Sequence, residues 1–520
     1  MSDLNRRRWQ GAVWLAALLA LTLAVRVGVL VAMQENLRQD PDAYRNIADN
    51  LLLLRVYGMG QSSRTPRPTA YRPPLYPMLL AKFASDGTQV VLWRVAVIHV
   101  VLGLATVGLM WVVAGQMFQS GPLAPRVGIE SGPLAPRVEE HSRSECTTLE
   151  LAFRVTAGLL VASDPLLLNQ STLVMTETLA AFLTVLCLFA LNRFTADRRP
   201  WNAGLAGCAI ALAILCRPTY LPWLALVGIT MLMLRHTNPK RERGSAIEAG
   251  GGSPSLALRV SFVSRIGNWL RRGVNVATLG LIAAIVVSPW AIRNYRVFGK
   301  PIVSTTHGGY TLYLANNHDF YDDLQTDYSG LPWDSAQFGR NWQNSRYQSV
   351  ERMTIVASGG PKSRPSPSLL SLHSEILIDK AAYFEANRVI RDRPAVFAYS
   401  CLYRLRQLWS PLPHRLTADE PPMRTAMRYA VAAWYVAVYL LAAVGTWKLR
   451  SKLLAPPWLW GVLLCLVFTG IHTFYWTNLR MRAPLMPFVA LVAAQGLSEI
   501  VRRVGQARSA SAGPPESTSR

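Results

Sequence analysis

Two carboxylates stand close together in the segment that follows the first apolar run of the chain. Asp40 and Asp42 occur in the sequence QDPDAYRNIADNLL, a few residues past that run. A carboxylate pair at this spacing could supply a general base, bind a metal ion, or cap the helix that follows. Aspartate is favoured at helix N-caps and Pro41 suits a first turn. The role of cap and the role of base are therefore both open, and one residue could serve as both.

Two more acidic residues lie at the ends of later apolar runs. Glu177 occurs in MTETL, and Asp164 is a weaker candidate of the same kind. A carboxylate that faces lipid is costly, so a functional one is expected to face a wet cavity. The alternative is a side chain that reaches the membrane surface without a catalytic role.

Basic residues form a second group of candidates. The planar guanidinium of arginine donates two parallel hydrogen bonds and therefore suits a phosphate group. The candidates are Arg217, Arg293, Arg480 and Arg482, together with Arg72 in YRPPLYP and His472 near the end of an apolar run. The alternatives are an interfacial arginine for Arg72 and an interhelical hydrogen bond for His472.

The stretch HGGYTLYLANN combines glycines with aromatic and amide side chains. As a loop that closes over a ligand, it could stack Tyr310 or Tyr313 on a ring and bond hydroxyls through Asn316 and Asn317. A Gly-Gly turn between two short strands fits the same residues.

The composition predicts that these residues are held by membrane helices. Of the 520 residues, 51% are hydrophobic and 16% are charged, against roughly 25% charged in soluble domains. The apolar runs are long enough to cross a hydrocarbon core of about 30 Å. We therefore expect an all-α polytopic membrane protein with about ten transmembrane helices. They are placed at residues 11–32, 90–114, 151–168, 173–192, 202–216, 218–234, 273–292, 426–446, 458–475 and 483–500.

The basic residues also predict the orientation. The net charge is +24, but the charges flank apolar runs on alternate sides, which the positive-inside rule explains and which does not indicate nucleic-acid binding. The cytoplasmic groups are then Arg6–Arg8, Arg193–Arg199, Arg235–Arg243, Lys448–Lys452 and Arg502–Arg503. Both termini are expected in the cytoplasm, with residues 33–89 and 293–425 outside, so the arginines on the outer side oppose the trend and are better functional candidates.

The outer loops and the insertions have different patterns. In PDAYRNIADNLLLL, Tyr44, Ile47, Ala48 and Leu51 fall on one helical face, which predicts a helix on the membrane surface. Disorder on the cytoplasmic side is predicted for residues 118–148, 236–272 and 501–520. The first of these segments repeats SGPLAPRV, at Ser120 and at Ser131, and a further loop is expected from Ser358 on the outer side. The six scattered cysteines indicate neither a disulfide framework nor a zinc site. The first apolar run lacks a cleavage motif and is predicted to remain as a span.

Five motifs occur in one order along the chain. They are DPDAY with YRPPLYP, MTETLAAFL, SPWAIRNYRVFG, HGGYTLYLANN and LRMRAPLMP. The set resembles the bacterial GT-C membrane glycosyltransferases of the family 39-like group, similar to protein O-mannosyltransferases and to the enzyme that adds aminoarabinose to lipid A. The resemblance covers almost the whole chain apart from the inserted loops. It implies a GT-C-like bundle with surface helices and a mixed loop region on the outer face.

The resemblance also implies an activity. A sugar would pass from a polyprenyl-phosphate donor to an acceptor hydroxyl on a protein, lipid or glycan, with inversion, on the periplasmic face of the bacterial inner membrane. Asp40 matches the position of the family's base and Asp42 the alternative spacing; Pro41 stands where closer relatives of the mannosyltransferases carry Glu, which leaves the choice open, with Asp40 favoured. Glu177 resembles the second acidic position, and Arg482 and Arg480, then Arg293, are favoured for the donor phosphate.

Other functions fit parts of the same pattern. A divalent metal at Asp40 and Asp42 is possible but not expected, because the enzymes that the chain resembles do not need one for catalysis. A transporter or flippase of lipid-linked sugars would share the spans, although the inverted repeats of transporters are not evident. A polymerase or ligase of surface polysaccharide would use a similar donor.

Overall fold

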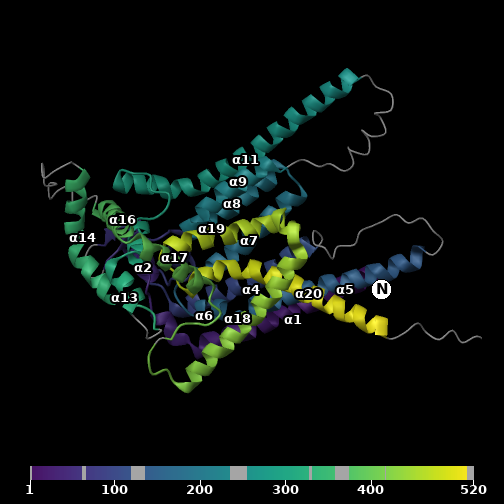
Figure 1. Cartoon of the computed structure of the whole chain (residues 1–520), viewed down its shortest axis with the longest axis horizontal. Helices are drawn as coiled ribbons and strands as arrows, with labels where there is room; N and C mark the ends of the chain where they lie inside the picture. Colours follow the sequence, from purple (N-terminus) through teal and green to yellow (C-terminus); the bar gives the residue numbers. More distant parts are fainter. Residues whose placement is uncertain are drawn as a thin grey trace, which may run out of the picture.

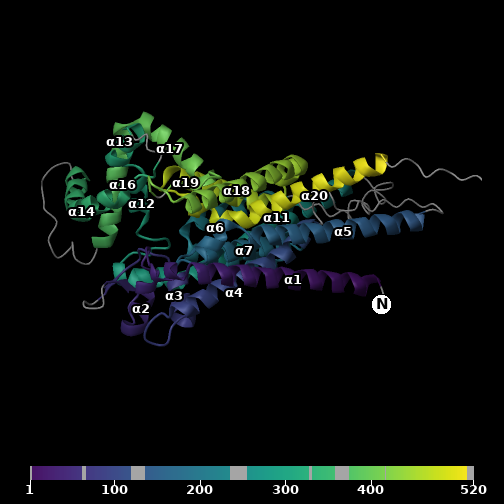
Figure 2. The same cartoon turned by 90° about the horizontal axis from the view of Figure 1, so that it is seen from below.

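The computed structural model describes residues 3–60, 66–118, 135–234, 254–326, 331–357, 374–415 and 417–511. Long helices run alongside one another, and short helices gather across one end of the bundle (Figures 1 and 2). The long helices are α1 (Asp3–Ala32), α4 (Leu92–Phe118), α5 (Ala135–Ala162), α7 (Glu177–Ala196), α8 (Pro200–Cys216), α9 (Leu221–Met233), α11 (Pro254–Phe298), α18 (Pro422–Leu449), α19 (Trp458–Phe474) and α20 (Met486–Ser511).

The apolar helices confirm the predicted all-α polytopic membrane architecture. Among the described residues, six helices are long and apolar enough to cross a membrane, and three shorter apolar helices lie with them. Large apolar side chains such as Leu281 and Leu440 are exposed on the sides of the bundle, as expected for surfaces that face lipid. Each of the ten predicted spans overlaps a helix, and the number of crossings stays a prediction.

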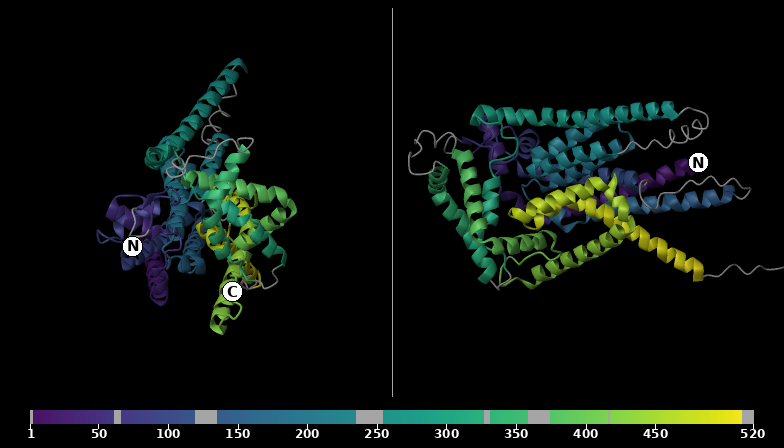
Figure 3. Two further views of the ribbon diagram at one scale, coloured as in Figure 1. Left: turned by 90° about the vertical axis from the view of Figure 1, so that its left-hand side faces the viewer. Right: turned by 45° about the horizontal axis from the view of Figure 1, so that its top comes forward.

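One end of the bundle is built from short elements, seen face on in the left panel of Figure 3. They are η1 (Gln34–Arg38), α2 (Tyr44–Leu54), β1 (Gly58–Met59), β2 (Arg67–Pro68), α3 (Leu75–Phe83), α12 (Gly308–Ala315), α13 (His318–Thr326), α14 (Ser335–Ala357), α16 (Ser374–Asp392) and α17 (Pro394–Trp409). The connecting turns are α6 (Pro165–Gln170), η2 (Pro218–Tyr220), η3 (Arg450–Leu454) and η4 (Leu479–Leu485). The amino terminus and the end of α20 both lie at the opposite end of the bundle (Figure 2).

Helix α2 has the predicted amphipathic face. Tyr44, Ile47 and Ala48 are buried, because these positions fall on one side of a helix with 3.6 residues per turn. The only strands among the described residues, β1 and β2, pair antiparallel next to this helix.

The region from His307 differs from both sequence interpretations, because it forms helix α12. Its glycines serve close packing: a Cβ at Gly309 would overlap the carbonyl oxygen of Asp379 in α16. A residue without a side chain is therefore needed for α12 to approach α16, and no turn between strands is formed.

Helices also extend into the segments predicted to be disordered. Helix α5 covers residues 135–148, α11 covers 254–272, and α20 continues to Ser511. Once an apolar span has nucleated a helix, adding a residue requires no new nucleus, so polar flanks can continue it. The other parts of these segments, residues 119–134, 236–253 and 512–520, and the loop from Ser358, lie outside the described residues.

The packing of α20 fixes the turn that precedes it. At the contact with α18, a Cβ at Gly445 would overlap the carbonyl oxygen of Val492, and one at Gly496 would overlap that of Leu441. Small residues let the two backbones touch, as is common between membrane helices. The turn η4, which carries Arg480, runs directly into α20 of this closely packed pair.

Candidate active site

Charged side chains from separate parts of the chain meet near the end of the bundle that carries the short helices. We call the set the acid–arginine cluster: Asp42, Arg72, Glu177, Arg217 and Arg480. Asp42 precedes α2, Arg72 precedes α3, Glu177 begins α7, Arg217 follows α8, and Arg480 lies in η4. Helices that run in alternate directions end here, so residues far apart in the sequence share one site.

Arg480 joins the two carboxylates of the acid–arginine cluster. Its Nη1 lies 3.5 Å from Asp42 Oδ2 and its Nε lies 3.9 Å from Glu177 Oε1. Arg72 Nη2 donates to Asp42 Oδ1 at 2.8 Å, and its Nε donates to the Asp42 carbonyl oxygen at 3.0 Å. Arg217 Nη2 lies 3.3 Å from Glu177 Oε1. The two 2.8–3.0 Å bonds fix Asp42 on Arg72, whereas Arg480 holds both acids loosely.

The acid–arginine cluster carries an excess of positive charge. Three arginines face two carboxylates, which leaves one formal positive charge. Among the described residues, Arg217 Nη1, Arg480 Nε and Glu177 Oε2 are buried without a hydrogen-bond partner. Buried polar atoms are nearly always paired, so free donors beside an excess cation indicate a place for an anionic ligand.

Aromatic rings hold Arg72 in place. Its guanidinium lies 5.6 Å from the ring centroid of Tyr44 and 5.2 Å from that of Tyr71. Tyr44 in turn meets Tyr76 edge to face at 5.4 Å. Burial raises the pKa of both Tyr44 and Tyr71, so both hydroxyls keep their protons at neutral pH.

The structure separates the two candidate bases. Asp40 accepts the backbone N–H of Arg45 at 3.2 Å and that of Asn46 at 3.0 Å, and so caps the first turn of α2. Ala43, which follows Asp42 and directly precedes α2, has a left-handed backbone with φ of 58°, and the Asp42 side chain is bonded to arginines rather than to the α2 amides. The sequence prediction favoured Asp40 for the base, but of the two acids it is Asp42 that lies beside the arginines.

Two favoured arginines lie apart from the acid–arginine cluster and bind backbone carbonyls. Arg482 Nη1 donates to Leu408 at 3.1 Å and to Ser410 at 2.6 Å. Arg293 donates to the carbonyls of Thr69 and Tyr57, each at 2.7 Å. In the 3₁₀ turn η4, residues two apart point in different directions, so Arg480 and Arg482 cannot face the same ligand.

The remaining membrane-end candidates have separate surroundings. His472 in α19 is buried and lies within the electrostatic reach of Arg217 and Arg480, so it borders the acid–arginine cluster. Asp164 accepts the N–H of Leu167 at 2.9 Å and the hydroxyl of Tyr435 at 3.0 Å. It therefore caps α6 and lies outside the cluster.

The amides of the α12 segment serve the fold. Asn316 donates to the carbonyls of Leu312 and Phe474, and Asn317 accepts the N–H of Phe320 at 2.8 Å, which caps α13. Tyr313 packs edge to face on Phe338 and Trp342. Of the four residues predicted to contact a ligand, Tyr310 alone lines the cavity described next.

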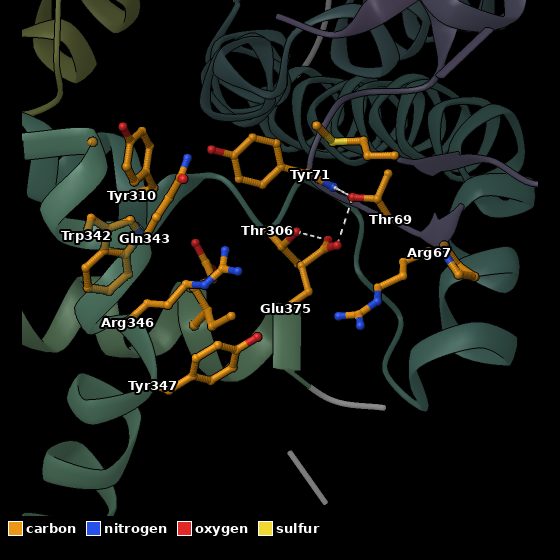
Figure 4. Close-up of a pocket in the computed structure, with 15 residues that line it drawn as sticks. Arg67, Thr69, Tyr71, Thr306, Tyr310, Trp342, Gln343, Arg346, Tyr347 and Glu375 are labelled. Atoms are coloured by element: carbon orange, nitrogen blue, oxygen red, sulfur yellow. Dashed lines mark hydrogen bonds between the residues drawn. The ribbon is translucent and has the colours of Figure 1, made fainter. Parts of the chain in front are cut away.

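That cavity lies beside the acid–arginine cluster and has a volume of about 400 Å³. Figure 4 shows its lining side chains, which include Arg67, Tyr71, Tyr310, Trp342, Arg346 and Glu375. Tyr71, which lines the cavity, is adjacent in sequence to Arg72 of the cluster, and its ring lies 4.2 Å from that of His307. The two sites are therefore separated by this pair of rings.

Two acids of the cavity were not identified from the sequence. Glu375 and Asp379 both line it, and their spacing of four residues on α16 puts them on one helical face. Glu375 accepts the N–H of Ala70 and the hydroxyl of Thr69, both at 2.8 Å, and is also bonded by Thr306. The signal was the acidic pair in SEILIDK, but only the fold places it near Tyr71.

Asp379 gives the cavity a measurable pH dependence. Burial raises its pKa to about 6, and the charge of Glu375 adds to the rise. The hydrogen bond from Gly309 N–H at 2.7 Å lowers the pKa but does not cancel the effect of burial. Because the unfolded value is about 3.9, this carboxyl favours folding when protonated, and that contribution is lost as pH rises from about 4 to 6.

We expect Asp379→Asn, which can still accept from Gly309, to raise the melting temperature more at pH 7 than at pH 4.5. An equal shift at both pH values, measured by fluorescence melting in detergent, would contradict this.

Metal-binding residues do not gather in the described part of the chain. No group of three or more His, Cys, Asp or Glu side chains there is arranged to hold a metal ion. Asp40 and Asp42 also diverge, since one bonds backbone amides and the other bonds arginines.

Comparison with known proteins gives structural matches only. No protein-family model matches the chain, and no curated protein matches it. The archaeal oligosaccharyltransferase AglB of Archaeoglobus fulgidus, solved with an inhibitory peptide and a dolichol-phosphate, has a TM-score of 0.48 at 12% identity over 98% of this chain and 53% of its own. An Archaeoglobus fulgidus oligosaccharyltransferase with Zn and sulfate has a TM-score of 0.44 at 13% identity over 94% and 49%.

A third match is ArnT from Cupriavidus metallidurans, bound to undecaprenyl phosphate. It has a TM-score of 0.36 at 13% identity over 97% of this chain and 81% of its own. The chain thus spans about half the length of the two oligosaccharyltransferase chains. The matched proteins are GT-C glycosyltransferases, the class that the sequence motifs resemble.

Proposed function

We propose that the chain is an integral-membrane glycosyltransferase that moves a sugar from a polyprenyl-phosphate donor to an acceptor hydroxyl at the acid–arginine cluster. The observation that carries the proposal is the bridge of Arg480 between Asp42 and Glu177, with one excess positive charge and buried donors that lack partners. A sugar phosphate ester supplies the missing anion. The helix ends around the cluster would let a lipid-linked phosphate arrive from the bilayer.

The proposed reaction is an inverting displacement. The acceptor oxygen attacks the anomeric carbon, the bond from that carbon to the phosphate oxygen breaks, and polyprenyl phosphate leaves with the electron pair. The acceptor proton passes to the Asp42 carboxylate, which Arg72 orients. Preorganised cations stabilise the charge that develops on the leaving phosphate, a role for Arg480 and Arg217, and Glu177 positions both.

The proposed setting is the inner membrane of a bacterium. With both termini in the cytoplasm, as the distribution of basic residues predicts, the acid–arginine cluster would lie at the periplasmic face. The lipid donor, membrane lipids and an acceptor of protein, lipid or glycan class are then the partners.

The first test is consumption of a donor. The purified protein in liposomes is incubated with radiolabelled polyprenyl-phosphate sugars and an envelope extract. We expect one donor to be consumed, its label to move to the extract, and EDTA to leave the rate unchanged. Movement of intact labelled lipid across the bilayer without cleavage would instead support a flippase, and acceptance only of oligosaccharide-linked lipid would support a polymerase or ligase.

A further inference from the structure

The cavity between α12, α14 and α16 combines aromatic faces with charged side chains. Tyr71, Tyr310, Trp342 and Tyr347 line it together with Gln343 and Asp379 (Figure 4). Its volume of about 400 Å³ lies within the roughly 300–1,000 Å³ usual for small-ligand sites. The space and the lining therefore suit a small polar molecule with an apolar face.

The charged side chains of the cavity differ in how many of their polar atoms already have partners. Glu375 is occupied by bonds from Thr69, Ala70 and Thr306. Among the described residues no ion pair is formed by Arg67 or by Arg346, whose Nε is buried without a hydrogen-bond partner. The formal charges of Arg67 and Arg346 balance those of Glu375 and Asp379, but Glu375 already accepts three hydrogen bonds, whereas Arg346 has a buried donor without a partner among the described residues. The guanidinium donors that remain available favour a ligand with an acidic group.

The position of the cavity connects it to the proposed chemistry. Tyr71 forms part of its wall, and the guanidinium of the next residue, Arg72, holds Asp42 at 2.8 Å. The His307 ring is tilted against that of Tyr71, with centroids 4.2 Å apart, and stacks on that of Tyr310, with centroids 5.5 Å apart. The ring of Tyr71 thus stands between the cavity and the Asp42 carboxylate that the proposed reaction uses as its base.

We propose that this cavity binds the acceptor of the transfer reaction, and that the acceptor is a carbohydrate with an acidic group; the inference rests on the proposed function. A pyranose presents C–H groups on one face, which pack on the ring of Trp342 or Tyr310. Its hydroxyls lie at the edge, within reach of planar polar groups such as Gln343 and Asp379. Its carboxylate or phosphate pairs with Arg346 and Arg67, for which the arginine fork is suited.

The binding test uses probes that differ only in charge. Tryptophan fluorescence or calorimetry compares the trimer of galacturonic acid with its methyl ester, at pH 7 and low salt. We expect the acidic trimer to bind about tenfold more tightly than the ester, because only the acid pairs with the two arginines. Equal binding of acid and ester, or binding of neither, would overturn the proposal, and so would equally tight binding of triglutamate, which would assign the cavity to an acidic peptide.

Two arginines of the same helix provide the matched variants. Arg346→Gln removes a cavity cation and should abolish most of the preference for the acid over the ester. Arg340→Gln, where the side chain is exposed and bonds only Gln337, should leave the preference unchanged. A preference that survives Arg346→Gln contradicts the assignment, and melting curves of both variants show whether the fold is kept.

The binding test is independent of the transfer assay. Asp42→Asn should bind the acidic trimer as the wild type does, because Asp42 does not line the cavity. If the wild-type protein binds the trimer but consumes no donor, the proposed function fails and the saccharide site stands. If a donor is consumed while the trimer, the ester and triglutamate all fail to bind, the acceptor inference fails and the transferase stands.

Discussion

Replacement of Asp42 by asparagine is expected to lower sugar transfer by at least about 100-fold, since general-base catalysis typically contributes 10²–10⁴ in rate. The amide keeps the size of the side chain and can still accept the Arg72 hydrogen bond at Oδ1, so the local structure should persist. The measurement is the single-turnover rate with saturating donor, together with the melting temperature in detergent.

Asp40→Asn is the matched control. Asparagine caps a helix about as well as aspartate, and among the described residues the Asp40 side chain accepts hydrogen bonds only from the two backbone N–H groups of Arg45 and Asn46. Its transfer rate should stay within a few-fold of the wild type. The opposite pattern, an active Asp42→Asn and an inactive Asp40→Asn, would return the base to Asp40.

The choice between these two acids shows what the sequence could not decide. Both are good capping residues and both lie within reach of the following helix, so the local preferences are the same. The difference arises at Ala43, whose left-handed φ of 58° turns Asp42 away from the α2 amides that Asp40 binds. An alanine gives no sequence signal for that conformation, which disfavours residues other than glycine and asparagine.

Features that depend on local periodicity were predictable. The apolar runs gave helices at each expected place, and the face of α2 with Tyr44, Ile47 and Ala48 is buried. The cavity was missed because its walls come from β2, α12, α14 and α16, elements whose proximity no local pattern encodes. For the same reason α12 was mistaken for a loop or turn: Gly309 fits against Asp379, seventy residues farther along the chain.

The second large effect concerns Arg480. Arg480→Gln is expected to lower the rate of the chemical step by about 10²–10³, the usual cost of losing one preorganised donor to a developing negative charge. Among the described residues, the polar partners of its side chain are the two carboxylates and the sulfur of Met175, and each carboxylate keeps a second arginine, so the melting temperature should change little. Arg480→Lys, which keeps the charge but loses the planar fork, should recover part of the rate.

Arg482→Gln, two residues away, separates catalysis from folding. Arg482 is buried, bonds the carbonyls of Leu408 and Ser410, and lies 4.2 Å from the ring of Tyr435. Its loss leaves the buried carbonyl of Leu408 and the partly buried carbonyl of Ser410 short of a donor; an unsatisfied buried acceptor costs about 1–3 kcal/mol, so the melting temperature should fall. The transfer rate per folded molecule should stay close to that of the wild type, because the side chain does not face the acid–arginine cluster. If Arg482→Gln instead lowered the rate of fully folded protein as much as Arg480→Gln, the phosphate would have to be bound from the Tyr435 side of η4, and Asp42 could not be its neighbour.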